Sequence, residues 1–432
     1  MKARILLVSM VTTLCLWSCS DKNNVIDEPK IPLQIEPEPV SQPETRHSYT
    51  PVQLDNTQQA INIKLQEFSW KLFKEVYANR ESGTNLMISP ISLEVDLGMF
   101  INGLEGETLQ EVLKTMGLEN YTKVQINDFF KTMIGGIEKA DEAAVFKSAN
   151  AFWYNQHFTA NADFLSAISS NYAAKAEAVN FSDPQTVTKI NAWCAEQTND
   201  RIKDMLQITT EADIFHLMNA VYFKASWMQV FEKEKTSTQP FHYANGTTAN
   251  VDMMHQIFET SVVETDKCLI AVKPFVDNSF RMLFMQPKEG VDMVEIIPDV
   301  MESITSFLAD KSSMDFGERV QLDLYAPKFT AEYSEKHLFD YMKNINPSLD
   351  FERVDLKKDY ILFDDTNNYD VMASQKTFFL MDEVGAEAAA VTDIAGFTSV
   401  PRPVTIRLDR PFFYAIVESN TQCPLFIGYY GN

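Results

Sequence analysis

The chain has 432 residues, of which 45% are hydrophobic and 12% aromatic, so it can bury a large core as one big domain or two ordinary ones. This aromatic content excludes a disordered chain. The formal charge of -23 at pH 7 and the lack of a stripe of Lys and Arg argue against a nucleic-acid partner, because phosphate binding needs clustered cations.

The first residues have the pattern of a processed export signal. Lys2 and Arg4 form a short basic region, and residues 5–17 are a mostly apolar run that is too short to span a bilayer. The run ends in the letters LWSC, at Cys19, which resemble the lipobox of bacterial lipoproteins. That resemblance implies a signal peptide over residues 1–18 and a lipid on the cysteine. An ordinary secretory signal with an incidental cysteine is the alternative.

Residues 19–55 have the composition of a tether. They are rich in proline and acids and lack helical periodicity, which is typical of an extended linker. A tether after a lipidated cysteine would hold a domain clear of a membrane, so we expect a lipid-anchored protein of the bacterial cell envelope. Ser20 and Asp21 are compatible with delivery to the outer membrane, facing either the periplasm or the outside.

Helix signals are concentrated early in the folded part, which begins at about residue 56. A first helix is indicated by apolar residues at helical spacing, namely Ile61, Leu65, Phe68, Leu72 and Val76. Residues 106–117 predict a second helix, with Thr108 and Glu111 as a capping box and Gly117 as its end. Residues 184–206 predict a third long helix.

Strand signals follow. Residues 320–329 alternate apolar and polar side chains, and residues 219–227 and 280–287 are apolar enough for buried strands. We find no internal repeat and no second linker between residues 56 and 432. The sequence therefore predicts one large domain of mixed helices and sheet over residues 56–432.

No catalytic or metal-binding motif stands out. The chain lacks a nucleophile elbow, a phosphate-binding loop, a dinucleotide fingerprint and a zinc-protease motif, and its six histidines never fall at i, i+4 spacing. Beyond the signal region, Cys194, Cys268 and Cys423 are widely spaced and form no disulfide framework. We expect a protein that is not an enzyme and uses no cofactor or metal.

The stretch DEVGAEAAAVTDIAGFTSVPRP, residues 382–403, is hard to place as helix, strand or loop. If it forms a strand, every second side chain from Ala386 to Gly396 is small or apolar, and both acids fall on the opposite face. Gly385 offers a pivot at its base. The segment can therefore exist as a loop and also enter a sheet.

This stretch resembles the hinge of the reactive-centre loop of the serpins. The residues that carry the resemblance are Glu383, Val384, Gly385, Ala386, Glu387, Ala388, Ala389 and Ala390. Residues 406–416 and the final CPLFIGYYGN resemble the C-terminal serpin strands, and NLMISPISLEVDLGMFINGLEGET, LMNAVYFKASW and VDMMHQ resemble serpin elements upstream, in the family's order. The resemblance implies an α+β serpin fold, with mixed helices around three β-sheets and an exposed, insertable loop.

The resemblance also implies a mechanism, in which a target protease attacks the loop, forms an acyl-enzyme and is trapped when the cleaved loop inserts as a new strand of the main sheet. Family members are cut about fourteen residues after the hinge glycine, which points to Ser399-Val400, with Thr398 and Phe397 as alternatives. Proline after the bond disfavours cleavage at Arg402. Small or aromatic bait residues suit elastase-like, subtilisin-like, papain-like or chymotrypsin-like proteases.

Further residues match positions that control insertion in the family. They are Ser89, Ser92, Asn219 and Gln375 beneath the opening sheet, and Trp227, Lys328 and Glu383 at its top. Most relatives have a histidine where this chain has Gln375, and glutamine can hydrogen-bond in the same way but does not titrate near neutrality. We therefore expect no pH sensitivity from that position.

Two readings of the function remain open. Some serpins are carriers, chaperones or storage proteins, and those usually have bulky, charged or proline residues in the hinge. Ala388, Ala389 and Ala390 are what an inhibitor needs. We therefore expect a monomeric protease inhibitor whose partner is a serine or cysteine protease and which meets a membrane only through its lipid; a non-inhibitory binding lipoprotein is the alternative.

Overall fold

A computed structural model describes residues 49–81, 83–309, 316–349, 359–363, 375–386 and 401–431. The predictions for Cys19, for most of the tether and for residues 387–400 lie outside the described residues. Within the described ranges, every helix is too short or too polar to cross a bilayer.

Helices make up much of the first half of the chain. Those described are α1 (Asn56–Asn79), α2 (Pro90–Phe100), α3 (Gly106–Thr115), α4 (Lys123–Ile137), α5 (Ala162–Tyr172), α6 (Pro184–Gln197), α7 (Ile297–Ala309) and α8 (Leu338–Ile345).

The predicted first helix is confirmed as α1. It begins with a capping box in which Asp55 Oδ1 accepts from Gln58 N at 2.8 Å and Gln58 Oε1 accepts from Asp55 N at 3.1 Å. Its apolar face packs on the C-terminal strands, where the rings of Phe73 and Phe413 meet edge to face with centroids 4.9 Å apart.

The second predicted helix is confirmed as α3, with the predicted first residue, but the predicted capping box is wrong. Helix α3 begins at Gly106, so Thr108 lies inside the first turn and makes no capping box with Glu111. Instead the backbone N and Oγ1 of Thr108 both donate to Asp359 Oδ2, at 3.1 and 3.2 Å. A carboxylate from a distant segment therefore takes the place of a local cap. The predicted end is correct, since Gly117 has a φ of +74° just beyond the helix.

The third predicted helix is shorter than expected. Helix α6 ends at Gln197, because Asn199 and Asp200 have φ values of +50° and +62°, which a right-handed helix does not allow. Residues 198–206 therefore form a separate segment, which matters for the site described below.

The described strands form three sheets. A nine-stranded sheet has the order β1 (Leu86–Ile88), β15 (Pro424–Tyr430), β14 (Phe412–Glu418), β8 (Phe280–Pro287), β7 (Cys268–Pro274), β6 (Thr248–Glu264), β9 (Glu318–Pro327) and β13 (Arg402–Arg407), with β5 (Ser237–His242) beside β6. A four-stranded sheet has the order β12 (Gly385–Ala386), β4 (Phe215–Ser226), β2 (Val145–Asn155) and β3 (Lys175–Val179). Strands β10 (Phe329–Glu335) and β11 (Gln375–Met381) form the third. The predicted α+β class with three sheets is confirmed.

The centre of the nine-stranded sheet is the most deeply buried part of the fold. Every residue of β8, β14 and β15 is buried, and β8 coincides with the apolar run predicted at residues 280–287. A strand buried on both faces needs no polar alternation, which is why the apolar run was readable in the sequence.

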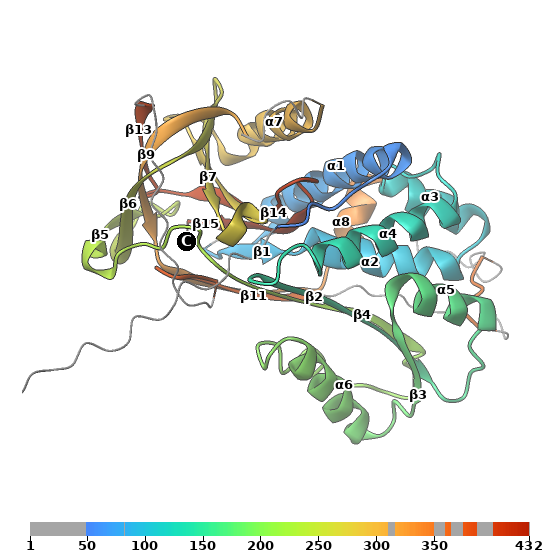
Figure 1. Cartoon of the computed structure of the whole chain (residues 1–432). Coiled ribbons are helices and arrows are strands. Elements are labelled where there is room, and N and C mark those ends of the chain that lie inside the picture. Colours follow the sequence, from blue (N-terminus) through green and yellow to red (C-terminus); the bar gives the residue numbers. More distant parts are fainter. Residues whose placement is uncertain are drawn as a thin grey trace, which may run out of the picture. The chain divides into compact units, whose positions relative to one another are not determined.

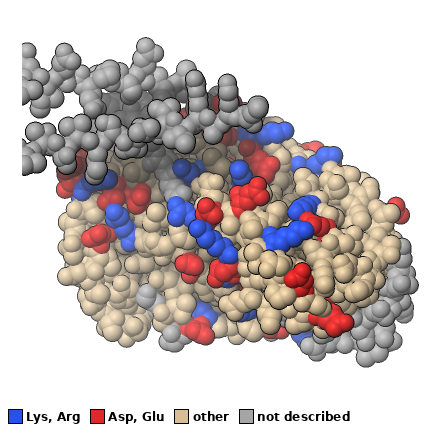
Figure 2. All heavy atoms as spheres, turned by 90° about the horizontal axis from the view of Figure 1, so that it is seen from below, with Lys and Arg blue, Asp and Glu red and all other residues tan. Residues whose placement is uncertain are grey.

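The long strands β2 and β4 lie between two layers of helices. They run with β11 through the lower half of Figure 1, with α2 above them and α6 below. Figure 2 shows the molecule from below, and on that face acidic and basic side chains are interspersed. This face therefore carries no large patch of one sign.

Helix α2 carries a buried carboxyl group. Glu94 is 2% exposed, and its Oε1 accepts a hydrogen bond from Ser69 Oγ on α1. Burial raises the pKa of Glu94 to about 8, although the bond from Ser69 opposes the shift. The group is therefore largely protonated at neutral pH.

We predict that Glu94→Gln makes the protein more stable at neutral and alkaline pH. Between pH 4.5 and 8 the unfolded state loses the Glu94 proton while the folded state keeps it, so the free energy of unfolding falls as the pH rises. The variant should lose this slope and gain about 3 kcal/mol at pH 7. Urea denaturation at pH 5, 7 and 8 measures it, with exposed Glu119→Gln as control. Equal slopes in the variant and the wild type would contradict the prediction.

Candidate functional site

The chain reverses direction immediately after β11, in a turn formed by Asp382, Glu383 and Val384, which we call the hinge turn. Asp382 Oδ1 accepts from the backbone N of Val384 at 2.8 Å and of Gly385 at 3.1 Å. An aspartate that bonds its own backbone in this way favours a tight turn. The turn directs β12 back along β4.

Strand β12 pairs antiparallel with the end of β4. Gly385 lies opposite Ser226, and Ala386 lies opposite Ala225. Gly385 has a φ of +139°, and a Cβ atom there would lie 2.4 Å from Ala225 O. Only glycine fits this position, because any side chain would strain the backbone and collide with β4.

All three carbonyl groups of the hinge turn are held by the residues that follow β4. Trp227 Nε1 donates to Asp382 O at 3.0 Å, Trp227 N donates to Val384 O at 2.9 Å, and Phe231 N donates to Glu383 O at 2.8 Å. We call residues 227–231 the hinge seat. Trp227 is buried and stacks on Phe275 at 4.4 Å between ring centroids.

An ion pair between a buried glutamate and a partly exposed lysine adds to this anchorage. Lys328 Nζ lies 2.8 Å from Glu383 Oε2, and Thr236 Oγ1 donates to Glu383 Oε1 at 3.0 Å. Burial by itself would raise the pKa of the Glu383 carboxyl, but the hydrogen bonds from Lys328 and Thr236 and the charge of Lys328 keep it below its ordinary value. The same bond raises the pKa of Lys328. Both groups are therefore charged at neutral pH.

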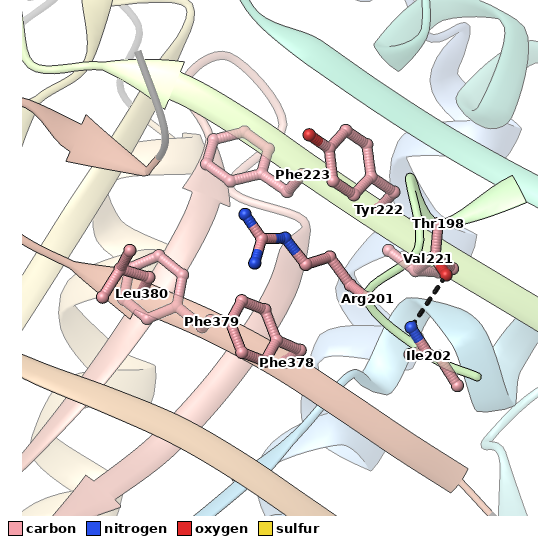
Figure 3. A pocket seen from close by; sticks show the side chains of 9 residues that line it. All are labelled: Thr198, Arg201, Ile202, Val221, Tyr222, Phe223, Phe378, Phe379 and Leu380. Atoms are coloured by element: carbon pink, nitrogen blue, oxygen red, sulfur yellow. Dashed lines mark hydrogen bonds between the residues drawn. The ribbon is translucent and has the colours of Figure 1, made fainter. Parts of the chain in front are cut away.

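A gap that we call the slot separates β4 from β11. Within the described residues the two strands belong to different sheets, and a narrow pocket lies between them. Figure 3 shows the residues that line it, which are Thr198, Arg201, Ile202, Val221, Tyr222, Phe223, Phe378, Phe379 and Leu380. The Arg201 guanidinium lies between Phe223 of β4 and Phe378 of β11 (Figure 3), with its Cζ atom 5.0 Å from the centroid of the Phe378 ring.

The segment after α6 bridges the slot. Asn199 Nδ2 donates to Tyr222 OH on β4 at 3.2 Å. On the other side, Lys376 of β11 donates to Asp204 O at 2.7 Å and lies 2.9 Å from its carboxylate. Residues 199–204 are thus bonded to β4 on one side of the slot and to β11 on the other.

The floor of the slot is tied to α2. Gln375 Oε1 accepts from Ser89 N at 2.7 Å, and Gln375 Nε2 donates to Ser89 O at 2.8 Å, so this glutamine links β11 to the start of α2. The Asn219 amide of β4 instead donates to Ser148 and Asn150 of β2, at 2.7 and 2.6 Å. Ser92 is buried on α2.

Arg402 lies on the C-terminal side of the undescribed residues 387–400. It begins β13, and its Nη2 lies 3.0 Å from Glu318 and 3.7 Å from Glu264. About half of each of these side chains is exposed, so the ion pairs add little to stability. In the described part of the chain, no cluster of His, Cys, Asp and Glu could hold a metal ion.

The short strand β12, paired with β4 at one end of the slot, agrees with the similarity of most of the chain to one family. A family model described as Serpin (serine protease inhibitor) matches residues 64–432. The chain belongs to the serpin family. Serpins are generally protease inhibitors and not enzymes.

The relatives of this serpin are distant. It is 27% identical to an uncharacterized serpin-like protein of Thermococcus kodakarensis over 412 residues, which cover 91% of this chain and 92% of the relative. It is also 27% identical to the alpha-1-antiproteinase of Rattus norvegicus over 382 residues, which cover 86% and 89% of the two chains.

Solved structures show the same fold. The thermophilic serpin tengpin in its native state superposes with a TM-score of 0.74 at 26% identity, covering 90% of this chain and 100% of tengpin. Thyroxine-binding globulin in complex with thyroxine superposes with a TM-score of 0.72 at 23% identity, covering 87% and 98%. The fold therefore includes a protein that binds thyroxine, so the function of this serpin has to be argued from its own residues.

The structure places the residues that the sequence singled out in two groups. Trp227, Lys328, Glu383 and Gly385 meet at the hinge turn, while Ser89, Ser92 and Gln375 lie at the floor of the slot. The side chain of Asn219 is turned away from the second group toward β2. The bait residues 397–400 and hinge residues 387–390 lie outside the described residues.

Sequence reasoning missed several residues of the site. Phe231 and Thr236 bond the hinge turn, and Arg201 lies in the slot. None belongs to a local motif, because each reaches the site through a tertiary contact. Arg201 lies in the segment 198–206, for which the sequence predicts a continuation of the helix that the structure ends at Gln197.

We predict that Gln375→His makes stability depend on pH. A neutral imidazole can accept the hydrogen bond from Ser89 N, but a protonated one cannot, so folding lowers the pKa of the new side chain. Above pH 6.5 stability should be constant and about 1 kcal/mol below that of the wild type, because Ser89 O loses its donor. Below pH 6.5 it should fall further by about 1.4 kcal/mol per pH unit.

Denaturation at several pH values measures this effect, with Gln375→Leu as the control. The leucine variant leaves both Ser89 groups without this partner and should lose about 2–3 kcal/mol at every pH. A histidine variant as flat with pH as the wild type would contradict the prediction.

Proposed function

We propose that this serpin is an irreversible suicide-substrate inhibitor of proteases. The observation that carries the proposal is β12, in which Gly385 and Ala386 already pair with β4 at the mouth of the slot. This is the first step of adding a strand. Cleavage of the loop would free the following residues to continue the same strand, and the protease acylated on the loop would be carried with them.

The register of β12 supports the length of the proposed strand. If the pairing of Gly385 with Ser226 continued residue by residue, Thr392 would lie opposite Asn219 and Gly396 opposite Phe215, the first residue of β4. Strand β4 is therefore long enough to receive Gly385 to Gly396, the part of the loop with one small and apolar face. The bait residues follow directly after it.

The proposed bait bond is Ser399-Val400, with Thr398 and Phe397 as alternative residues before the bond. Arg402 is excluded on two grounds, because Pro403 follows it and because Glu318 and Glu264 hold its guanidinium in β13. We therefore propose a target with a small or aromatic primary pocket, either an elastase-like or subtilisin-like serine protease or a papain-like cysteine protease, bound by a monomer as a covalent acyl complex.

We predict that the chain without its signal peptide forms an SDS-stable complex with a serine protease of this group, or inactivates a papain-like one in a fixed ratio. Thr392→Arg should turn it into a cleaved substrate, because the inward face would bury a charge at a cost on the order of several kcal/mol. Asp393→Arg is the matched control, since the same side chain one residue later faces outward and should leave inhibition intact.

The assay pairs gel electrophoresis with the residual activity of the protease, and mass spectrometry of the released C-terminal fragment fixes the bond. Cleavage with full retention of protease activity would defeat the proposal and favour the alternative, a non-inhibitory carrier with the serpin fold. If Thr392→Arg still formed the covalent complex, the proposed register of the inserted strand, with Thr392 facing inward, would be wrong.

We also propose that Cys19 carries a lipid and that residues 19–55 tether the domain to the bacterial envelope. The support is the export signal that ends at this cysteine. In cells of a lipoprotein-producing bacterium fed with labelled palmitate, the full chain should take up label and partition into detergent. Cys19→Ala should do neither, and equal labelling of both chains would contradict the anchor.

A further inference from the structure

Strand β7 carries a lysine that the site described above does not use. Lys273 is 1% exposed, and no carboxylate of the described residues lies within ion-pair distance of its Nζ atom. Burial lowers the pKa of Lys273 well below its ordinary value. A buried lysine without a counter-ion is costly, so its contacts identify what this side chain does.

Three aromatic rings surround the ammonium group. Nζ lies 4.3 Å from the ring centroids of Phe231 and Phe258, and 5.3 Å from that of Trp227. All three rings are buried. The faces of aromatic rings attract a cation, so this cage offsets part of the lost hydration.

Lys273 is hydrogen-bonded to the hinge seat, once directly and once through Gln256. Nζ donates to Gln229 O at 2.9 Å and to Gln256 Oε1 on β6 at 2.6 Å. Gln256 Nε2 in turn donates to Val230 O at 2.9 Å. The carbonyl groups of two consecutive seat residues are thus held by one lysine and its glutamine partner.

The hinge seat also donates the hydrogen bonds that hold the hinge turn. Trp227 and Phe231 donate hydrogen bonds to the hinge turn. The same two residues lie on either side of Gln229 and Val230 in the chain, and their rings form part of the cage around Lys273. Met228 N also bonds Pro274 O, next to Lys273, at 3.0 Å. Lys273 therefore lies directly beneath the backbone that fixes the hinge.

We propose that Lys273 is a positioning residue for loop insertion, which fixes the hinge seat so that the turn after β11 directs the loop into the slot. The proposal rests on the proposed inhibitory function for its consequence, but its structural part is independent of it. Once the protease is acylated, insertion competes with hydrolysis of the acyl bond. A loosened seat delays entry of the strand and lets more protease escape.

Lys273→Met separates this role from a merely structural one. Methionine keeps most of the length and an apolar stem, and it removes the amine and both donated bonds. The gain from no longer burying the amine opposes the loss at Gln229 O and Gln256 Oε1, which lose this donor, so the midpoint of denaturation should change little. Exposed Lys71→Met is the control for the change of residue type.

Hydrogen exchange followed by mass spectrometry tests the seat directly. In Lys273→Met, the amides of the peptide from Trp227 to Phe231 should exchange about tenfold faster, while those of β14 and β15 stay unchanged. Gln256→Leu, which keeps the lysine but removes its partner, should show the same change if Lys273→Met does not fold. Unchanged exchange in a folded variant, or faster exchange throughout the molecule, would overturn the proposal.

The consequence for inhibition is measured separately, as the number of inhibitor molecules consumed per protease inactivated. We expect this number to rise about threefold in Lys273→Met and to stay at the wild-type value in Lys71→Met. A wild type that never inhibits would defeat the proposed function and leave the exchange result to decide the role of Lys273. Faster exchange with unchanged consumption would overturn the link between seat and insertion.

Discussion

The backbone edge of β4 that faces β11 is the constraint on which the rest of the structure depends. In the described residues this edge has a ladder partner only at Ala225 and Ser226, where β12 begins. Exposed strand edges attract other strands, and buried backbone groups need partners. Arg201 and the rings beside it lie next to the following part of this edge, at Val221, Tyr222 and Phe223 (Figure 3). There the edge is covered by side chains and not by a paired strand.

The mouth of the slot and the rest of its length are held by different kinds of contact. Its mouth is fixed by backbone hydrogen bonds and by the ion pair of buried Glu383 with partly exposed Lys328. Along its length, the segment after α6 is attached by side-chain contacts such as that of Lys376 with Asp204, whose carboxylate is 70% exposed. An exposed ion pair of this kind is worth about 0–1 kcal/mol, whereas several buried hydrogen bonds act together at the mouth. A strand entering from the mouth therefore meets contacts that are weak one by one.

Much of the fold was readable from the sequence, because α1 and β8 are strongly periodic or continuously apolar and their tertiary surroundings agree with their local preference. The family resemblance supplied the residues at the hinge turn. The end of α6 was missed because it is set by left-handed Asn199 and Asp200, with no glycine or proline to mark it. Lys273 gave no signal at all, since an apolar run with one lysine looks like a strand whose cation reaches solvent, and only the packed structure encloses it.

The position of β14 and β15 governs what happens to the chain after a cut in the loop. The described strands C-terminal to the proposed bait bond are β13, which runs parallel to β9, and the β14–β15 pair, which lies between β8 and β1 with every residue buried. A single cut therefore leaves two polypeptides that share one hydrophobic core. They will travel as one particle through any native separation, and nicked and intact molecules will differ in mass only after denaturation.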